Sequence, residues 1–126
     1  MKIYTSYYSK VSRLDTSDYL LVCVSNTSPE WFDKKLYKID SNVYPDWTTI
    51  NHYKSGEITQ YKFRALYARK ISSQTQPEFI YQELENLGKI YDKENIVLLC
   101  WEKDAQACHR TMLAELISKG NYMGEL

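Results

Sequence analysis

The stretch NIVLLCW, residues 95–101, contains the longest uncharged apolar run of this 126-residue chain, Ile96 to Trp101. Its residues are apolar without alternation, a pattern typical of a strand that is covered on both faces. We therefore predict a central strand here. Two other segments, KIYTSYY (residues 2–8) and YLLVCVS (residues 19–25), are rich in β-branched, aromatic and apolar residues and are predicted to be further strands.

Helical patterns lie between and after these strands. The clearest one begins with Thr75 and Glu78 at capping-box spacing and has Pro77 in its first turn, where a missing N–H costs little. A shorter helix is expected to begin near Pro45, whereas residues 27–43 are expected to be irregular. The predicted helical segments are residues 44–56, 59–72, 75–91 and 108–120.

The order of these elements predicts an α/β fold. Long helical crossovers imply parallel strands, because a parallel return needs about a dozen residues or more whereas a hairpin needs only a tight turn. The chain is short enough to form a single domain, residues 1–126. We expect a compact three-layer, Rossmann-like domain with a mostly parallel sheet. The connection over residues 9–18 is short, so the first two strands need not be direct neighbours.

Composition and charge argue against several classes of protein. No apolar run approaches the roughly 20 residues of a membrane span, and a secretory signal pattern is absent, so a cytoplasmic location is expected. The formal net charge is zero, so there is no overall positive field to attract nucleic acid. Cys23, Cys100 and Cys108 are odd in number and irregular in spacing, and we expect free thiols. We expect neither a cofactor nor a metal ion.

Polar side chains follow each predicted strand, over residues 5–9, 25–28 and 100–110. Ligands of open parallel sheets bind at the carboxyl ends of the strands, where helix N-termini direct free N–H groups inward. In the third segment, a helix that starts near Cys108 would favour an anion, and Arg110 and Lys103 would add positive charge. The sequence therefore predicts a pocket for a small anionic ligand, a nucleotide or a phosphorylated metabolite.

The predicted binding residues come from all three segments. Glu102 and His109 would position the ligand or gain and lose protons beside it. No residue is assigned a catalytic role. Asn26 would add hydrogen bonds, and tyrosines and tryptophans such as Tyr8, Trp31 and Trp101 would offer stacking surfaces. The ligand-binding residues expected are Thr5, Ser6, Tyr7, Ser25, Glu102, Lys103, Cys108, His109 and Arg110.

The segment around the third strand resembles a known family. An apolar strand that ends in Leu-Cys, then Trp-Glu-Lys, then Cys108-His109-Arg110 is similar to the hallmark of the bacterial, archaeal and phage family called domain of unknown function 488. Upstream, IYTSYYSK (residues 3–10) and SNTSPEWFDKKLYKI (residues 25–39) resemble further motifs, so the likeness covers about residues 3–120. The resemblance implies a small Rossmann-like domain and no established activity.

One motif of that family is absent here. Many longer members carry Gly-His-Ser after the first strand, where this chain has Ser6-Tyr7-Tyr8-Ser9. A role for that histidine therefore does not transfer to this chain.

Several alternatives remain open at this point. Arg110 would instead form a structural clamp if it paired with Glu102 or Asp104. A cysteine phosphatase would use Cys100 as nucleophile, but nine residues separate it from Arg110 where the tyrosine phosphatase motif has about five. A hydrolase without a covalent intermediate would use Glu102 or His109 as general base.

A zinc site and a macromolecular partner are the remaining alternatives. Zinc ligands would be Cys100, Cys108 and His109 with Glu102 or His52, although the spacing lacks close pairs and neighbouring helical residues are expected to point in different directions. Nucleic acid would bind the basic stretches at residues 1–13 and 62–70, but the zero net charge makes this partner less favoured. A role as a protein-interaction module also remains.

Overall fold

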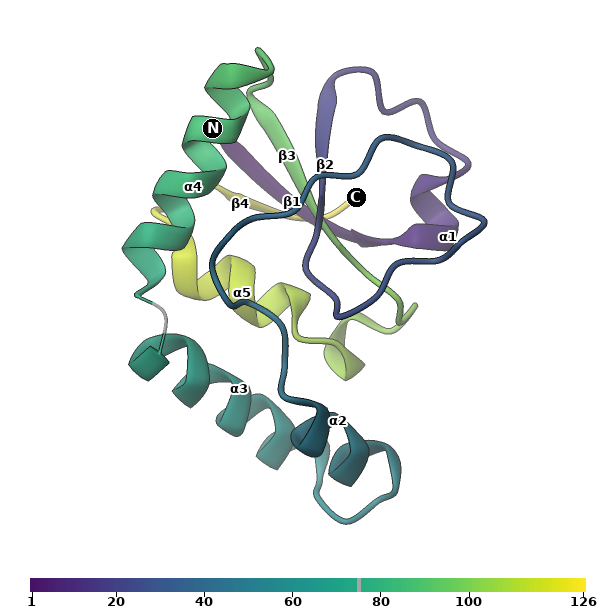
Figure 1. The fold of residues 1–126 in the computed structure, drawn as a ribbon, viewed down its shortest axis with the longest axis vertical. Helices are drawn as coiled ribbons and strands as arrows, with labels where there is room; N and C mark the ends of the chain where they lie inside the picture. Colours follow the sequence, from purple (N-terminus) through teal and green to yellow (C-terminus); the bar gives the residue numbers. More distant parts are fainter. Residues whose placement is uncertain (75) are drawn as a thin grey trace.

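A computed structural model describes residues 1–74 and 76–126, and within them it contains a four-stranded, all-parallel sheet (Figure 1). The strand order is β2-β3-β1-β4. β3 is flanked by β1 and β2, and its apolar residues from Ile96 to Cys100 are at most 1% exposed, so the predicted central strand is confirmed. The strands are β1 (Lys2–Tyr7), β2 (Tyr19–Cys23), β3 (Asn95–Cys100) and β4 (Tyr122–Glu125).

Helices connect these strands largely as predicted. α4 begins with Pro77 in its first turn, and the predicted cap residue Thr75 lies outside the described residues. The last helix starts at Arg110 rather than near Cys108, so the predicted start is two residues early. A short helix directly after β1 was not predicted. The helices are α1 (Tyr8–Val11), α2 (Trp47–Lys54), α3 (Gln60–Gln74), α4 (Pro77–Ile90), the 3-10 turn η1 (Ala105–Ala107) and α5 (Arg110–Ile117).

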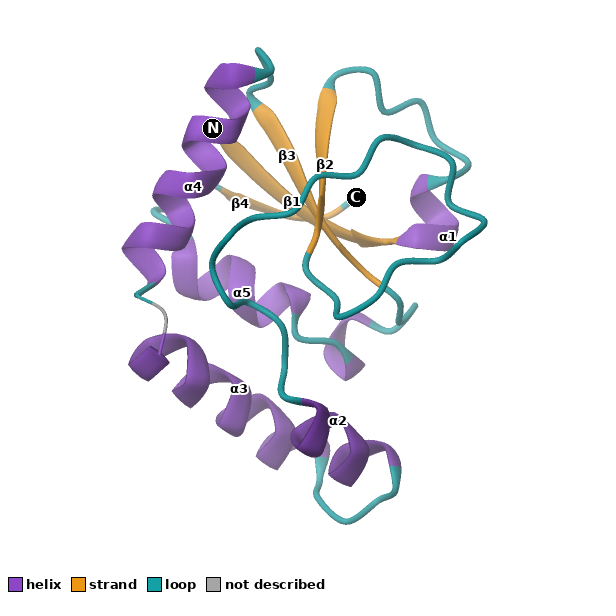
Figure 2. Cartoon of the chain, viewed as in Figure 1, coloured by secondary structure: helices purple, strands orange, loops and turns teal. Residues whose placement is uncertain are grey.

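The sheet separates two hydrophobic clusters, which confirms the three-layer α/β architecture. α4 and α5 cover one face and contribute apolar side chains such as Leu84 and Leu113. On the other face, Tyr8 and Val11 of α1 pack with Phe32 from the long irregular segment. α3 packs on α5 rather than on the sheet, and α2 packs on α3, so these two helices extend the domain at one end (Figure 2).

Two connections explain the strand order. β3 lies between β1 and β2, as the short connection between the first two strands allows. β4, which was not predicted, follows a turn in which Gly120 has φ 83° and then pairs with the free edge of β1. A positive φ is accessible to glycine without a steric penalty, so this residue permits the chain to turn back onto the sheet.

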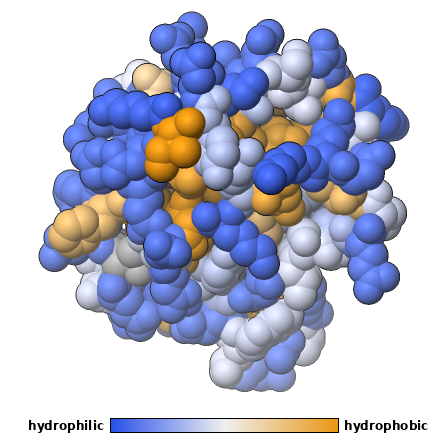
Figure 3. All heavy atoms as spheres, turned by 45° about the horizontal axis from the view of Figure 1, so that its top comes forward, coloured by the Kyte–Doolittle hydropathy of each residue, from blue (hydrophilic) through white to orange (hydrophobic). Residues whose placement is uncertain are grey.

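The surface of the domain is largely hydrophilic on the face shown in Figure 3, with small hydrophobic areas between polar side chains. Of the helices in residues 1–74 and 76–126, none combines the length and the apolar character that a bilayer span requires.

Candidate functional site

A cavity of about 290 Å³ opens at the carboxyl ends of β2 and β3, between these strand ends and the α2–α3 pair. One wall consists of apolar and aromatic side chains from α2 and α3, including Trp47, Tyr53 and Phe63. The opposite wall is polar and reactive, and it contains Cys100, Glu102, Cys108 and His109 together with Ser25, Asn26, Thr27 and Trp101. The cavity therefore lies at the edge of the sheet where the sequence predicted a ligand site.

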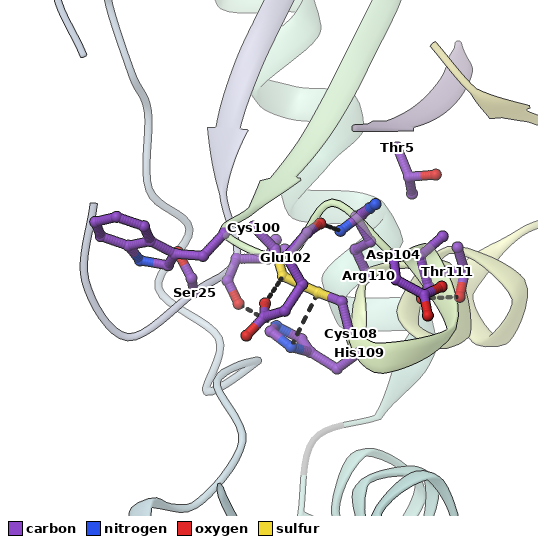
Figure 4. The surroundings of a disulfide bond; sticks show 12 residues. Thr5, Ser25, Cys100, Glu102, Asp104, Cys108, His109, Arg110 and Thr111 are labelled. Carbon is purple, nitrogen blue, oxygen red and sulfur yellow. Dashed lines mark hydrogen bonds between the residues drawn. A yellow bond between two sulfur atoms is a disulfide. The ribbon is translucent and has the colours of Figure 1, made fainter. Parts of the chain in front are cut away.

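Three side chains of the polar wall converge. Cys100 ends β3, Cys108 follows η1, and His109 is the N-cap of α5. One ligating atom from each of these residues lies within 4.8 Å of the other two, and all three residues are buried (Figure 4).

The local backbone explains this convergence. The side chain of Asp104 accepts a hydrogen bond from Gln106 N at 2.9 Å and so caps the η1 turn. Cys108 then has an extended backbone, with φ −123° and ψ 156°, before His109 enters the helical region. The expectation that Cys108 and His109 point in different directions is therefore wrong, because neither residue lies inside a helix.

The histidine of this cluster has a defined tautomer. His109 Nε2 is hydrogen-bonded to the backbone oxygen of Val24, which can only accept, so Nε2 carries the proton. Nδ1 then presents its lone pair toward Cys108 Sγ, 3.7 Å away. Burial is the main cause that lowers the pKa of His109 to about 4, with a further contribution from the positive charges of Arg110 and Lys70. The imidazole is therefore neutral at physiological pH.

The two cysteines of the cluster are joined. The structure links Cys100 and Cys108 in a disulfide, so the expectation of free thiols is wrong for this pair, whereas Cys23 is free and buried. The error arose because spacing along the chain did not show that the loop returns to the end of β3. Glu102 Oε2 lies 3.3 Å from Cys100 Sγ, and in the reduced state that thiol can donate a hydrogen bond to this carboxylate.

Arg110 does not face this cavity. Its side chain is fully buried and extends away from the disulfide in Figure 4. Nε donates to Glu125 Oε2 at 3.1 Å and Nη2 to Glu125 Oε1 at 2.7 Å, while the backbone oxygens of Glu102 and Lys103 accept from Nη1 and Nη2 at 2.6 and 3.3 Å. The expectation that the guanidinium of Arg110 faces the ligand pocket is therefore wrong. Arg110 is a clamp, and its ionic partner is Glu125 of β4 rather than Glu102 or Asp104.

The predicted residues of β1 lie outside the cavity, and two of them, Thr5 and Tyr7, contact the clamp of Arg110 and Glu125. Thr5 Oγ1 is hydrogen-bonded to Tyr122 Oη at 2.6 Å and also donates to Glu125. The guanidinium of Arg110 lies over the Tyr7 ring, with Cζ 5.7 Å from the ring centroid. Ser6 Oγ is buried and has no hydrogen-bond partner among the described residues. All three side chains lie outside the cavity lining.

The remaining predicted residues divide between the wall and the surface. Ser25 Oγ donates to Thr27 O at 2.6 Å and is hydrogen-bonded to Tyr8 Oη at 2.8 Å, so it orders the end of β2. Trp101 Nε1 donates to Thr27 O at 2.8 Å, which fixes the indole in the cavity wall. Lys103 is exposed and contributes only its backbone oxygen to the clamp. His52 is exposed on α2, where it pairs with Glu57 at 3.6 Å, outside the cysteine cluster.

The aromatic wall was missed at the level of sequence. Trp47, Ile50, Tyr53 and Lys54 all come from the segment in which a short helix was expected near Pro45, and Phe63 lies in the helix expected over residues 59–72, to which no binding role was assigned. The closely spaced aromatic residues of residues 44–56 were the available signal, but nothing in the sequence indicated that they face the end of β3.

Fold and site together define a class of protein: a small, all-parallel α/β domain with a cysteine–histidine cluster in the wall of a cavity at the carboxyl edge of its sheet. A family model described as the active DUF488-N3 subclade matches residues 6–121. The chain belongs to the DUF488 family, a family of domains of unknown function, as the resemblance implied. No curated protein and no solved structure shows significant similarity to the chain.

Proposed function

We propose that this domain binds a small molecule of the nucleoside or nucleotide class in the cavity between α2–α3 and the ends of β2 and β3. The observation that carries the proposal is the shape and chemistry of the cavity. Its volume of about 290 Å³ is close to the lower end of ordinary ligand pockets, roughly 300–1,000 Å³. Aromatic side chains on one wall and hydrogen-bonding groups on the other suit a flat ring that carries polar substituents.

The charges around the cavity refine the anionic ligand expected from the sequence. Lys54, which is exposed on α2, is the cation in the lining, whereas Arg110 is buried against Glu125. A phosphate of the ligand would therefore lie near Lys54, and the base would stack on Trp47 or Tyr53. Glu102 supplies a negative charge to the inner wall, where it would accept hydrogen bonds from the N–H groups of a base.

Thermal unfolding in the presence of a panel of nucleosides and nucleotides tests the proposal. A ligand at 100 times its dissociation constant stabilises the folded state by about 2.7 kcal/mol. For 126 residues this corresponds to a rise in Tm of about 10 °C, from an unfolding entropy of about 2.1 cal/mol/K per residue. If no member of the panel raises the Tm at millimolar concentration, the proposal fails.

Two tryptophans provide a matched pair of variants. Trp47 and Trp31 are similarly exposed, at 58% and 56%, but only Trp47 lines the cavity. We expect Trp47→Ala to weaken ligand binding by about 1–3 kcal/mol, the usual contribution of stacking on a base, and Trp31→Ala to leave it unchanged. Lys54→Gln should weaken binding of nucleotides but not of the corresponding nucleosides.

A second candidate function is hydrolysis of the bound molecule, and the proton-accepting groups in the wall favour it. His109 Nδ1 and the Glu102 carboxylate both reach the cavity, and each can act as a general base. The matched subclade is described as active, which supports a search for turnover. A phosphatase with Cys100 as nucleophile gains no support, because Arg110 does not reach the cavity and Glu102 lies beside the sulfur. Release of base or phosphate that Glu102→Gln abolishes would establish hydrolysis.

Nucleic acid is not the partner that the geometry favours. Lys70 of the second basic stretch is buried and paired with Asp46. Lys2 lies at one end of β1, and Lys10 and Arg13 lie beyond the other end, so the first stretch does not form one patch. Binding to nucleic acid at low salt, weakening steeply as salt is added, would reverse this conclusion.

A further inference from the structure

The cluster of Cys100, Cys108 and His109 has the composition of a metal site. Two sulfurs and one imidazole nitrogen, all within 4.8 Å of one another, form a set of soft and borderline ligands. Zinc prefers this set, and it binds sulfur at about 2.3 Å and nitrogen at about 2.0–2.1 Å. Ligating atoms around a tetrahedral zinc ion therefore lie about 3.5–3.8 Å apart. The observed distance of 3.7 Å between Cys108 Sγ and His109 Nδ1 matches this spacing.

We propose that the reduced form of this cluster binds one Zn²⁺ ion through Cys100 Sγ, Cys108 Sγ and His109 Nδ1. The proposal does not depend on the identity of the ligand in the cavity, and it is tested without that ligand. The disulfide and the metal-bound dithiol are then two alternative states of the same pair of cysteines.

The hydrogen bond of the histidine is the first argument. Histidine ligands of zinc almost always donate their other ring N–H to a backbone oxygen or a carboxylate, which fixes the tautomer and the ring orientation. His109 has this arrangement, since Nε2 donates to Val24 O while the lone pair of Nδ1 faces the sulfur of Cys108. The imidazole also packs against Tyr67, with ring centres 4.9 Å apart, so its position is fixed before any metal arrives.

The backbone separation of the cysteines is the second argument. Their Cα atoms lie 7.1 Å apart, beyond the usual disulfide range of about 4.4–6.8 Å. A separation of this size leaves room for the sulfurs to move apart to the 3.8 Å or so that a shared zinc ion requires. Rotation of the Cys100 side chain is the change that this requires, because Cys108 Sγ already lies 3.7 Å from His109 Nδ1.

The position of the cluster decides where the fourth ligand would lie. All three residues line the cavity, so the open coordination position faces it. Glu102, whose carboxylate lies 3.3 Å from Cys100 Sγ, reaches the same position from the loop after β3. Three protein ligands and a position that is open to a cavity are characteristic of catalytic rather than structural zinc sites.

Loading the site from the disulfide requires a balanced redox step. A dithiol reductant transfers two electrons and two protons to the Cys100–Cys108 bond, which breaks to give two thiols, while the reductant becomes a disulfide. Zn²⁺ then replaces the two thiol protons, which are released to solvent, and His109 contributes the lone pair of Nδ1 without losing a proton.

The experiment titrates Zn²⁺ into the reduced protein in competition with a chromophoric chelator. We expect one ion per chain, and the Co²⁺-substituted protein should show sulfur-to-metal charge-transfer absorption. Cys100→Ser and Cys108→Ser should each lower the affinity by more than about 100-fold, which is the upper end of the loss caused by removing an outer-shell partner. Glu102→Gln should lower it less, since it leaves all three primary ligands in place.

Cys23 provides the matched control. It is a free, buried cysteine that is hydrogen-bonded to Tyr8 and lies outside the cluster. Cys23→Ser should therefore bind Zn²⁺ as the unsubstituted protein does. In the unsubstituted protein, Zn²⁺ should also slow alkylation of Cys100 and Cys108, measured by peptide mass spectrometry, and this measurement remains informative if a variant does not fold.

Three results would overturn the proposal. The first is a reduced protein that binds Zn²⁺ no more tightly than the Cys100→Ser, Cys108→Ser double variant. The second is an equal loss of affinity in Cys23→Ser. The third is a disulfide that persists in excess reductant, because the ligands would then never be available.

Discussion

Replacing Glu125 by glutamine should expose how much of the domain's stability depends on its last strand. Arg110 is 0% exposed and carries a positive charge, so its guanidinium needs a negative partner inside the protein. Glu125 provides that partner through two hydrogen bonds, at 2.7 and 3.1 Å. The amide that replaces the carboxylate would keep one acceptor but would turn a donor group toward Nε or Nη2, and the buried positive charge would remain uncompensated.

The size of the effect follows from the burial of the two partners. Removing one member of a fully buried ion pair costs about 3–5 kcal/mol. The side chain of Glu125 is 35% exposed, so water screens part of the interaction, and we expect a loss of about 2–3 kcal/mol in the free energy of unfolding. For 126 residues, an unfolding entropy of about 2.1 cal/mol/K per residue converts this loss into a fall in Tm of about 8–11 °C.

Thermal and urea denaturation measure the total loss, and hydrogen exchange locates it. The amides of β4 and of Leu126, whose N–H donates to Thr5 O at 2.8 Å, should lose protection more than those of β3. Glu115→Gln is the control, since Glu115 is exposed and forms no ion pair within residues 1–74 and 76–126.

A double-mutant cycle with Arg110→Met completes the test. The two changes together should cost less than the sum of the single changes, because the double variant buries no unpaired charge. If Glu125→Gln lowers the Tm by less than about 2 °C, as an ordinary surface substitution does, the proposed role of the Arg110–Glu125 pair in stability is refuted. Strict additivity in the cycle would refute it as well.

Three further predictions concern packing, pH and a second buried cation. Gly88→Ala should destabilise the domain by about 1–3 kcal/mol in urea, because a Cβ would lie 2.7 Å from a backbone oxygen in the turn before β3, and a stabilised variant would contradict this. Burial alone would raise the pKa of Glu125, but hydrogen bonds, chiefly from Arg110, outweigh it and lower the pKa below 4.5. The ionised carboxylate therefore contributes fully to the free energy of unfolding above pH 4.5, and this contribution is lost as the pH falls through the pKa of Glu125 in the folded state. Acid unfolding of Glu125→Gln should lack this pH-dependent contribution. Asp46→Ala should cost about 1 kcal/mol more than Lys70→Met, because only the former leaves the 7%-exposed Lys70 without its charged partner, and equal costs would contradict this.

The arrangement of the sheet followed from local patterns. The uninterrupted apolar run that ends at Cys100 indicated a strand buried on both faces, and β3 is that strand. Long helical connections indicated parallel pairing, and the short link after β1 indicated that β2 need not be its neighbour. β4 was not predictable in the same way. Tyr122–Glu125 is four residues long and contains Gly124, so its strand character depends on the edge of β1 against which it pairs.

Only part of the candidate site could be predicted from the sequence. The cluster of reactive residues after β3 could be located, because strand ends of a parallel sheet meet at one edge. The direction of the Arg110 side chain could not be predicted, since its partner Glu125 lies in a strand that no local pattern indicated. The aromatic wall from α2 and α3 was missed for the same reason: its position depends on how α3 packs against α5.

The sequence by itself determined the α/β class, the central strand, the principal helices and the edge of the sheet at which the polar and reactive side chains lie. These features depend on hydrophobic periodicity and on crossover length, which act over a few residues or along one connection. Only the tertiary structure decided that Cys100, Cys108 and His109 share a cavity wall while Arg110 is locked onto β4. The ion-pair partner of a buried charge is the opposite charge that the packed chain brings beside it. Which residue that is depends on contacts between distant segments, and no local sequence pattern encodes these contacts.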